Sequence, residues 1–427
     1  MRLDASDTRF LRADFGGADA YKLRTDDLLF TRYNGNRDFV GVCARVPELD
    51  SETVYPDKLI RVRIRHDLAD PRYVERAVHT AEARQFIAEK LKTSAGQVGI
   101  SGADLKNLTI PLAPLPEQKR IADKLDTLLA RVDTCRNHLT RVPAILKRFR
   151  QSVLAAATSG ELTREWRAHV DDGTTAVPPN AKPRDDESAT EISLPSTWVM
   201  TTGADIVEPG ADIVYGIVQP GQRLAEGIPY VRGMDIERGQ ILVSQLLKTS
   251  PAIASRYARS ALKGGDVLLG IIRATKVAIV PECLAGANIT QGTAHSRPSA
   301  MIQTRYLAVA LESPAIQSWL HAHYRGIDMP GLNLADVRQV PISLPPIEEQ
   351  TEIVRRVESL FAIADQLEAR YTTARTHIDR LTPALLAKAF CGELVRQDPG
   401  DTCANPPRSE GRVEPLSRKA RSEPNHR

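Results

Sequence analysis

The chain has 427 residues, of which 42% are hydrophobic and 26% charged, and its formal net charge is +4. This balance is typical of a globular protein with two or three domains, and the small positive charge is compatible with nucleic-acid binding without indicating it. The five cysteines form no Cys-x-x-Cys pair, which argues against a disulfide framework and a zinc finger. Neither a signal peptide nor a membrane span is recognisable, so we expect a soluble cytoplasmic protein.

The first predicted element is a buried strand at residues 25–30, where TDDLLF joins a polar turn to an apolar run. The loop that follows, residues 31–37, is rich in Arg, Asn and Tyr, which are side chains that read bases or hold phosphates. Further along, Arg61, Arg63 and Arg65 alternate as they would on the exposed face of a strand. Such a face either follows phosphates or is simply solvated.

A long helix is predicted after the proline-rich segment 111–116, because prolines end the preceding element and favour a helix start. Its apolar residues recur in steps of four and three from Ile121 to Val153, which is the spacing of a coiled-coil seam. The alternative is an ordinary amphipathic helix packed on its own core. Pro143 predicts a kink or a restart late in this segment.

A polar, proline-rich linker follows at residues 165–192, and a second domain opens at 194–198 with Leu-Pro-Ser-Thr-Trp. In this domain GGDVLL at 264–269 has the same turn-and-strand pattern as residues 25–30. The residues after Arg396 are rich in Pro, Arg and Glu without periodicity, and we expect them to be disordered.

The chain repeats itself at an offset of 232 residues, because Glu117-Gln118 aligns with Glu349-Gln350 without a gap from residue 103 to residue 164. The second copy has its own proline-rich lead and its own heptad helix, with apolar positions from Ile353 to Leu385 and Pro383 as a second kink or restart. Each copy closes with Gly-Glu-Leu, at 160–162 and 392–394. The order is therefore domain, helix, domain, helix, and two equal units whose helices pair antiparallel would be related by a pseudo-twofold axis.

The two domains differ in length. Asp266 lies 72 residues after Leu194, whereas only 26 residues precede the equivalent Asp27. Either the first domain lacks an opening segment, through truncation or a start set too late, or the two domains simply differ.

Signals for catalysis are weak. Asn405-Pro406-Pro407 is followed by Arg408 rather than the aromatic residue of an adenine methyltransferase motif, and there is no phosphate-binding Gly-x-x-x-x-Gly-Lys-Ser/Thr loop. His321 and His323 are two residues apart, which points them to different sides of a helix and disfavours a metal site. We expect no cofactor, no metal and no catalytic residue.

The segments at 111–133 and 342–371, with their proline-rich lead, Glu-Gln and heptad helix, resemble the conserved regions of type I restriction-modification specificity subunits. The segments DDLLFTRYNGNRDFVGVC (26–43), YGIVQPG (215–221) and ITQGTAHSRP (289–298) are also similar to that family. The resemblance implies a non-catalytic subunit that reads a bipartite DNA site and directs adenine methylation and restriction by partner subunits. The implied partners are double-stranded DNA, two methyltransferase subunits and motor-nuclease (restriction) subunits.

The expected fold is α+β, with two α/β target-recognition domains that alternate with two long helices paired as an antiparallel coiled coil. The expected boundaries are a shortened recognition domain at 1–110, a helical region at 111–164, the linker at 165–192, a second recognition domain at 193–340, a second helical region at 341–396 and the tail at 397–427.

Polar loops supply the candidate DNA contacts, because Arg and Lys suit guanine, Asn and Gln suit adenine, and basic groups hold phosphates. The predicted DNA-binding residues are Arg32, Tyr33, Asn34, Asn36, Arg37, Tyr215, Gln219, Arg273, Lys276, Gln291, Thr293 and His295. Two other functions stay open at this point. One is part of a fused methyltransferase or nuclease, and the other is a coiled-coil scaffold without a role on DNA.

Overall fold

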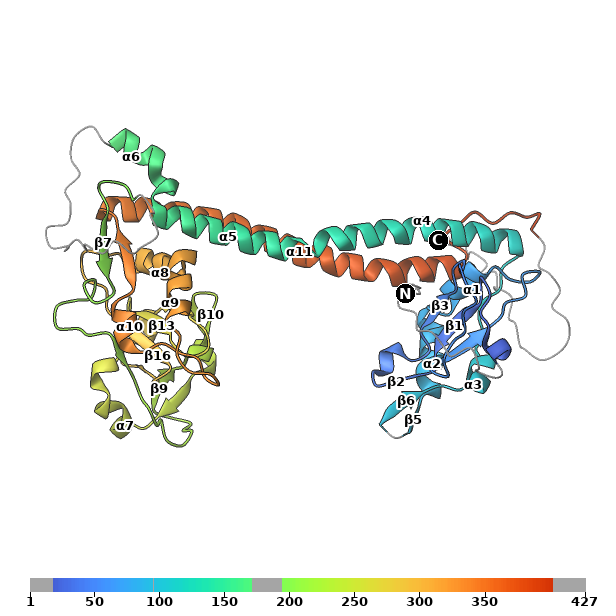
Figure 1. Ribbon diagram of the computed structural model, residues 1–427, viewed down its shortest axis with the longest axis horizontal. Coiled ribbons are helices and arrows are strands. Elements are labelled where there is room, and N and C mark those ends of the chain that lie inside the picture. The colour runs from blue at the N-terminus through green and yellow to red at the C-terminus, as the bar shows by residue number, and fades with distance from the viewer. Residues whose placement is uncertain (1–17, 95, 171–193, 402–427) are drawn as a thin grey trace, which may run out of the picture. The chain divides into compact units, whose positions relative to one another are not determined.

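The computed structural model describes residues 18–94, 96–170 and 194–401, and the chain divides into two compact units. Unit 1 comprises residues 1–141 and 371–427, and unit 2 comprises residues 142–370 (Figure 1). Both units combine small sheets with helices, so the α+β class expected from the sequence is confirmed. The linker residues 171–193 and the tail residues 402–427 lie outside the described part of the chain.

Unit 1 is built around β1 (Leu28–Thr31), which is the predicted strand and pairs antiparallel with β3 (Cys43–Arg45) and β4 (Leu59–Val62). A second sheet has the order β2-β6-β5. The strands of this second sheet are β2 (Tyr33–Asn34), β5 (Lys92–Ser94) and β6 (Gln97–Gly99). The helices of unit 1 that precede residue 141 are α1 (Pro71–Ala77), α2 (Ala81–Lys90), α3 (Gly102–Lys106) and α4 (Leu115–Leu139).

In unit 2 the central strand is β13 (Val267–Gly270), in a four-stranded sheet of order β14-β13-β16-β8. Its partners are β14 (Val277–Ile279), β16 (Thr293–Ser296) and β8 (Val214–Tyr215). A three-stranded sheet contains β12 (Leu247–Thr249), β9 (Ile228–Val231) and β15 (Asn288–Ile289). Two strand pairs are formed by β10 (Ile236–Glu237) with β11 (Gln240–Ile241) and by β7 (Val199–Thr202) with β17 (Pro341–Leu344).

The helices of unit 2 are α5 (Val142–Ser159), α6 (Arg164–Val170), α7 (Pro251–Arg256), α8 (Thr304–Glu312), α9 (Pro314–Ala322), α10 (Leu334–Arg338) and α11 (Ile347–Phe390), whose last residues belong to unit 1. Figure 1 shows α8, α9 and α10 close to the sheets of unit 2, whereas α6 extends away from them. Serine and proline set several of these starts. Ser250 and Ser313 cap α7 and α9, and each is followed by a proline in the first helical turn.

Within each unit, α11 packs antiparallel to the first heptad region. In unit 1 the early α4 residues Ile121 and Leu125 share a core with Leu386 and Phe390 from the end of α11. In unit 2 the order is reversed, because late α5 residues such as Val153 meet Ile353 and Val357 from the start of α11. These contacts bury the ends of the predicted seam, whereas Cys135, Leu367 and Leu381 are exposed.

The two prolines in the heptad regions act differently. The first region restarts at Pro143, because α4 ends at Leu139 and α5 begins at Val142. The second region continues through Pro383 inside α11, where a proline removes one helical hydrogen bond without ending the helix.

A glutamine near the start of each long helix ties that helix to its domain. In unit 1, Gln118 donates from Nε2 to the carbonyls of Leu68 (3.1 Å) and Ala113 (2.8 Å), and its Oε1 accepts from the Asp70 N–H. In unit 2, Gln350 donates to Met301 and Pro345 and accepts from the Gln303 N–H at 2.7 Å. Both glutamines are fully buried, so the repeated Glu-Gln is a structural joint between helix and domain.

The expected linker at 165–192 begins later than its composition suggested. Residues 164–170 form α6, so the first part of that segment is helical and not a loop. Arg167 explains the difference, because its guanidinium pairs with the buried Glu349 carboxylate and donates to the Gly160 carbonyl at 2.6 Å. Gly160 has a φ of +83°, and a Cβ atom there would lie 2.4 Å from Pro195 Cγ. Glycine is therefore required where α5 ends.

Candidate nucleic-acid interface

In unit 1 the predicted loop after β1 lies beside the β5–β6 hairpin. The Arg32 carbonyl accepts a hydrogen bond from the Ile100 N–H at 2.9 Å, and Tyr33 and Asn34 pair with Gly99 and Val98. Two polar segments that are some 60 residues apart in the sequence, 31–37 and 92–99, therefore form one continuous surface.

Unit 2 repeats this arrangement after β13. The Leu332 N–H donates to the Ile271 carbonyl at 2.8 Å, and the Arg273 N–H donates to the Pro330 carbonyl at 2.8 Å. The adjoining loop, residues 325–331, carries Ile327 at its tip with 97% of its surface exposed. At the 232-residue offset, residues 93–99 align with 325–331, so both units present the same pair of neighbouring loops.

The predicted residues of unit 1 lie together on this surface. Arg32 and Arg37 are exposed, and their guanidinium groups donate to the carbonyl oxygens of Asp57 and Ala88, respectively. The Arg32 guanidinium also lies over the Tyr33 ring, 5.9 Å from its centroid. Tyr33 donates its hydroxyl to Asp57 Oδ2 at 2.6 Å. Asn34 and Asn36 each accept a backbone N–H with the side-chain oxygen, which stabilises the loop.

In unit 2, five of the predicted residues are exposed. Arg273 has a left-handed backbone with a φ of +66°, an uncommon conformation that the bond to Pro330 stabilises. Tyr215, Gln219 and Gln291 come together because the Gln291 N–H donates to the Ile217 carbonyl at 3.1 Å. Lys276 is the fifth exposed residue, but its ammonium donates to the Ile236 carbonyl at 2.8 Å, which holds the charge against the protein.

The structure corrects the assignment of Thr293 and His295, which are buried and do not belong to an interface. His295 Nε2 lies 2.8 Å from Asp266 Oδ2, and Arg297 Nε lies 2.9 Å from Asp266 Oδ1. Burial by itself raises the pKa of Asp266, but hydrogen bonds from His295, Arg297 and the Lys263 N–H outweigh it and lower the pKa to about 2. The ITQGTAHSRP segment is polar because it builds a buried ion cluster.

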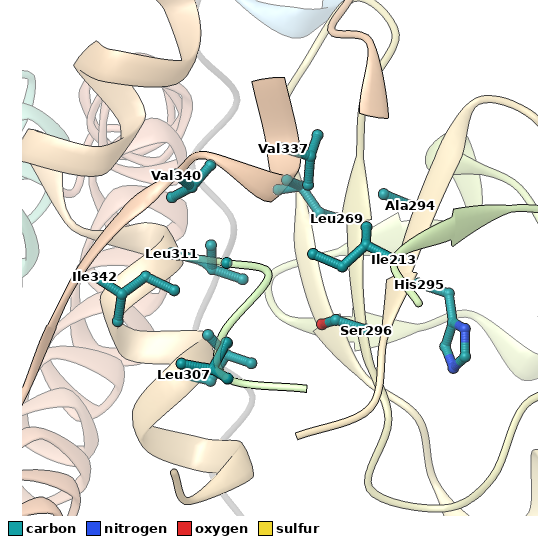
Figure 2. Close-up of a pocket in the computed structure, with 12 residues that line it drawn as sticks. Ile213, Leu269, Ala294, His295, Ser296, Leu307, Leu311, Val337, Val340 and Ile342 are labelled. Carbon is teal, nitrogen blue, oxygen red and sulfur yellow. The ribbon is translucent and has the colours of Figure 1, made fainter. Parts of the chain in front are cut away.

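A small cavity lies on the opposite side of β16 from this cluster. Figure 2 shows apolar side chains around it, including Leu269, Leu307 and Ile342, with the His295 imidazole turned away from them. The lining is almost wholly apolar, so we interpret the cavity as a gap in the core packing.

The alternating arginines of β4 and its extension have partners within unit 1. Arg63 pairs with the buried Asp27 at 3.0 Å, Arg61 donates to the Lys22 carbonyl, and Arg65 pairs with Asp67. Asp27–Arg63 is equivalent to Asp266–Arg297 in the other unit, because each aspartate precedes the central strand. Arg61 and Arg63 therefore hold parts of the domain together, whereas the Arg65–Asp67 pair is exposed on the surface.

Sequence reasoning missed the loops at 92–99 and 325–331. The missed signal was the 232-residue repeat, which continues without a gap on the N-terminal side of residue 103. It aligns Gly99 with Gly331, and it aligns Ser101 with Asn333, each of which caps a helix. Within the described residues, no group of three or more His, Cys, Asp or Glu side chains could hold a metal ion. No helix in the same part of the chain is long and apolar enough to cross a membrane.

Two α+β units with repeated polar loops, each tied to a long helix by a buried glutamine, define a class of tandem recognition proteins. The family model of the type I restriction modification DNA specificity domain matches residues 73–143 and 222–373. The chain therefore belongs to the family of type I restriction-modification specificity subunits. Subunits of this family are non-catalytic, and so is this chain.

Named relatives agree with this assignment. The chain is 37% identical over 334 residues to the type I restriction enzyme EcoBI specificity subunit of Escherichia coli, covering 78% of this chain and 68% of the relative. It is 30% identical to the StySPI specificity subunit of Salmonella potsdam, covering 89% and 77% of the two chains.

Solved structures support the fold. A chain from a study of complex assembly in the type I R-M system superposes with a TM-score of 0.63 at 19% identity, covering 87% of this chain and 83% of that one. The HsdS subunit from Thermoanaerobacter tengcongensis superposes with a TM-score of 0.52 at 21% identity, covering 87% and 82%.

Proposed function

We propose that this subunit reads a bipartite DNA site, one half with each unit, and directs adenine methylation and restriction by partner subunits. The observation that carries the proposal is the repeated pair of neighbouring segments, the loop after the central strand (31–37 and 272–276) beside the segment that ends at Gly99 or Gly331. A protein with internal twofold repetition suits a split site, because duplex DNA offers two equivalent half-sites on opposite strands.

Within each half-site, the exposed side chains divide by chemistry. Arg37 and Arg273 are suited to guanine edges or phosphates, and Asn34, Gln219 and Gln291 are suited to adenine edges. Arg32, Tyr33, Asn36 and Tyr215 complete the proposed contacts. Lys276 would join them only by releasing the Ile236 carbonyl.

The proposed domain boundaries follow the same division. Residues 1–110 and 193–340 would read DNA, and the helical regions 111–164 and 341–396 would bind two methyltransferase subunits, with restriction subunits joining that assembly. Exposed charged residues along α4 and α11 offer the polar surface that such docking needs. The work is done on cellular DNA, so we place the protein in the cytoplasm.

Methylation mapping tests the proposal. The full chain, purified with its cognate methyltransferase subunits and supplied with methyl donor, is expected to methylate adenine at one split sequence in a random-sequence library. The chain alone is expected to methylate and cleave nothing. Methylation by the isolated chain would favour an enzyme, and a complex that retains no DNA would favour a scaffold.

A further inference from the structure

In unit 2, residues 326–330 form a closed loop that presents apolar side chains to solvent. The Arg325 N–H donates to the Gly331 carbonyl at 2.8 Å, and the Gly331 N–H donates back to the Arg325 carbonyl at 2.9 Å, which closes the loop at its base. Within the loop, 97% of Ile327 and 57% of Met329 are exposed. Isolated apolar residues are ordinary on a protein surface, so the surroundings of this pair decide how it is interpreted.

The base of the loop is bonded to the loop that carries Arg273. The Arg273 N–H donates to the Pro330 carbonyl at 2.8 Å. A Cβ atom on Gly331 would lie 2.8 Å from the Ile271 carbonyl oxygen, so the two segments approach as closely as glycine allows. The apolar tip therefore adjoins a proposed DNA contact.

A third segment meets the same place. The Ile271 N–H donates to the Gly292 carbonyl at 3.0 Å, and Gly292 directly follows the exposed Gln291. Three segments that are distant in the sequence are thus joined by backbone hydrogen bonds. Two of them carry residues suited to base edges, Arg273 and Gln291, and the third carries the exposed Ile327.

The chemistry of the tip suits bases and does not suit phosphates. Residues 326–330 contain no Lys or Arg, and the exposed Asp328 places a carboxylate between the two apolar side chains. A carboxylate repels phosphates but accepts hydrogen bonds from base amino groups in the major groove. The apolar group that a base presents in that groove is the 5-methyl group of thymine. Ile327 and Met329 are therefore matched to thymine.

Unit 1 has a different chemistry at the equivalent positions. At the 232-residue offset, Ile327 aligns with Ala95 and Met329 aligns with Gln97. A methyl side chain and an amide replace the two long apolar side chains. A contact of this kind would therefore be made in the half-site of unit 2 alone.

We propose that Ile327, supported by Met329, selects a thymine in the half-site read by unit 2 by packing against its 5-methyl group. This contact rests on the function proposed above and adds a base determinant to its polar residues. Burial of one methyl group against an apolar side chain should strengthen binding by about 4-fold. Since Ile327 is almost fully exposed in the free chain, its truncation should leave the fold intact.

Replacement of thymine by uracil, which lacks only the 5-methyl group, tests the contact. The full chain, assembled with its cognate methyltransferase subunits, is titrated with a fluorescent duplex that carries its split sequence. Each thymine of both half-sites is replaced in turn. We expect one replacement to weaken binding by about 4-fold. Ile327→Ala should lose a similar factor on the thymine duplex and lose nothing further on that uracil duplex, because both changes remove the same contact.

The controls separate an apolar contact from a charge effect. The salt dependence of binding should stay unchanged in Ile327→Ala, because an apolar side chain releases no counterions. Ile327→Leu should keep most of the preference for thymine. Val243→Ala truncates another exposed aliphatic side chain of unit 2, outside the proposed contacts, and should bind both duplexes like the natural chain.

The outcomes distinguish this contact from the function on which it rests. A natural complex that prefers no split sequence would overturn both. A complex that binds one split sequence would overturn the thymine contact alone if no uracil replacement weakens binding, or if Ile327→Ala remains as sensitive to uracil as the natural chain. If sedimentation shows that Ile327→Ala no longer assembles with the methyltransferase subunits, the tip binds a protein, and the thymine contact is wrong.

Discussion

At the scale of single residues, the buried titratable groups stabilise the two domains. Asp266 and Asp27 each precede a central strand and each hold an arginine, and His79 in unit 1 contacts the Cys43 carbonyl through Nε2 at 2.9 Å. Burial lowers the pKa of His79 to about 4, although the contact with the Cys43 carbonyl opposes the shift. The lowered pKa values of Asp266 and His79 make stability depend on pH.

His79 is expected to destabilise the folded state in acid. Because the pKa of His79 in the folded state is about 4, below its ordinary value of 6.5, the free energy of unfolding is unaffected by this group above pH 6.5. It decreases as the pH falls toward 4, where the unfolded chain binds a proton that the folded chain does not. The shift corresponds to a loss of up to about 3 kcal/mol. Denaturant unfolding of His79→Gln should therefore show a flatter dependence on pH in that interval than the natural chain. An unchanged slope would show that His79 is not buried as a neutral group.

Asp266→Asn tests the reassignment of His295 from DNA contact to core. Loss of the carboxylate leaves the Arg297 guanidinium without its counter-charge, and breaking such a partly buried cluster costs about 3 kcal/mol. We expect that loss in the free energy of unfolding at neutral pH. Asp212→Asn, at an exposed position, is the control and should unfold like the natural chain. Equal stability of the two variants would contradict the structural role.

At the scale of elements, the repeated Glu-Gln joins each long helix to its domain. Gln350 makes three hydrogen bonds at the start of α11, to Met301, Pro345 and Gln303. Heptad periodicity predicted that the helices pair, but the pairing buries the helix ends and leaves the exposed Cys135, Leu367 and Leu381 outside the core. Val132, Leu146 and Ala364, which lie between these ends, are buried as well.

Gln350→Leu is expected to destabilise unit 2 by about 3 kcal/mol, because it leaves the part-buried Gln303 N–H, the part-buried Met301 carbonyl and the buried Pro345 carbonyl without this partner. Chemical denaturation measures the change. The control is Gln222→Leu on an exposed loop, which should unfold within error of the natural chain. A small effect of Gln350→Leu would mean that water replaces the lost bonds and that the joint is not a main source of stability.

At the scale of the whole molecule, the two units are expected to act on separate half-sites. Arg273→Ala should relax the base preference in one half of the methylated sequence, and Arg37→Ala in the other half, each by about 1–3 kcal/mol for a base contact. If an arginine holds a phosphate instead, its loss should weaken binding equally for all DNA sequences, and the number of counterions released on binding should fall by about one. Methylation mapping with the complete methyltransferase complex distinguishes these outcomes.

Matched controls for this prediction lie on the helices. Arg131→Ala and Arg370→Ala remove exposed charges from α4 and α11 and should leave the sequence preference unchanged. The double variant Arg37→Ala, Arg273→Ala should show the sum of the two single changes, because distant sites are additive. Changes in both half-sites from a single arginine would contradict one reader per unit.

The sequence by itself determined the repeat, the order of domains and helices, and the family, because heptad spacing, proline-rich leads and the Glu-Gln and Gly-Glu-Leu pairs are local patterns that survive without coordinates. It also placed the loop after each central strand, since a polar run after an apolar run marks the end of a buried strand. Arg37 and Arg273 were found in this way.

Only the tertiary structure decided which polar residues face outward. His295 and Gln291 lie in one polar segment, but β16 turns His295 toward Asp266 and leaves Gln291 exposed at the strand end. Glu117 and Glu349 occupy the same place in the repeat, yet Trp198 satisfies Glu349 alone. Local sequence cannot distinguish these cases, because the partners of a buried polar group come from other segments of the chain: Asp266 lies 29 residues from His295, and Trp198 lies 151 residues from Glu349.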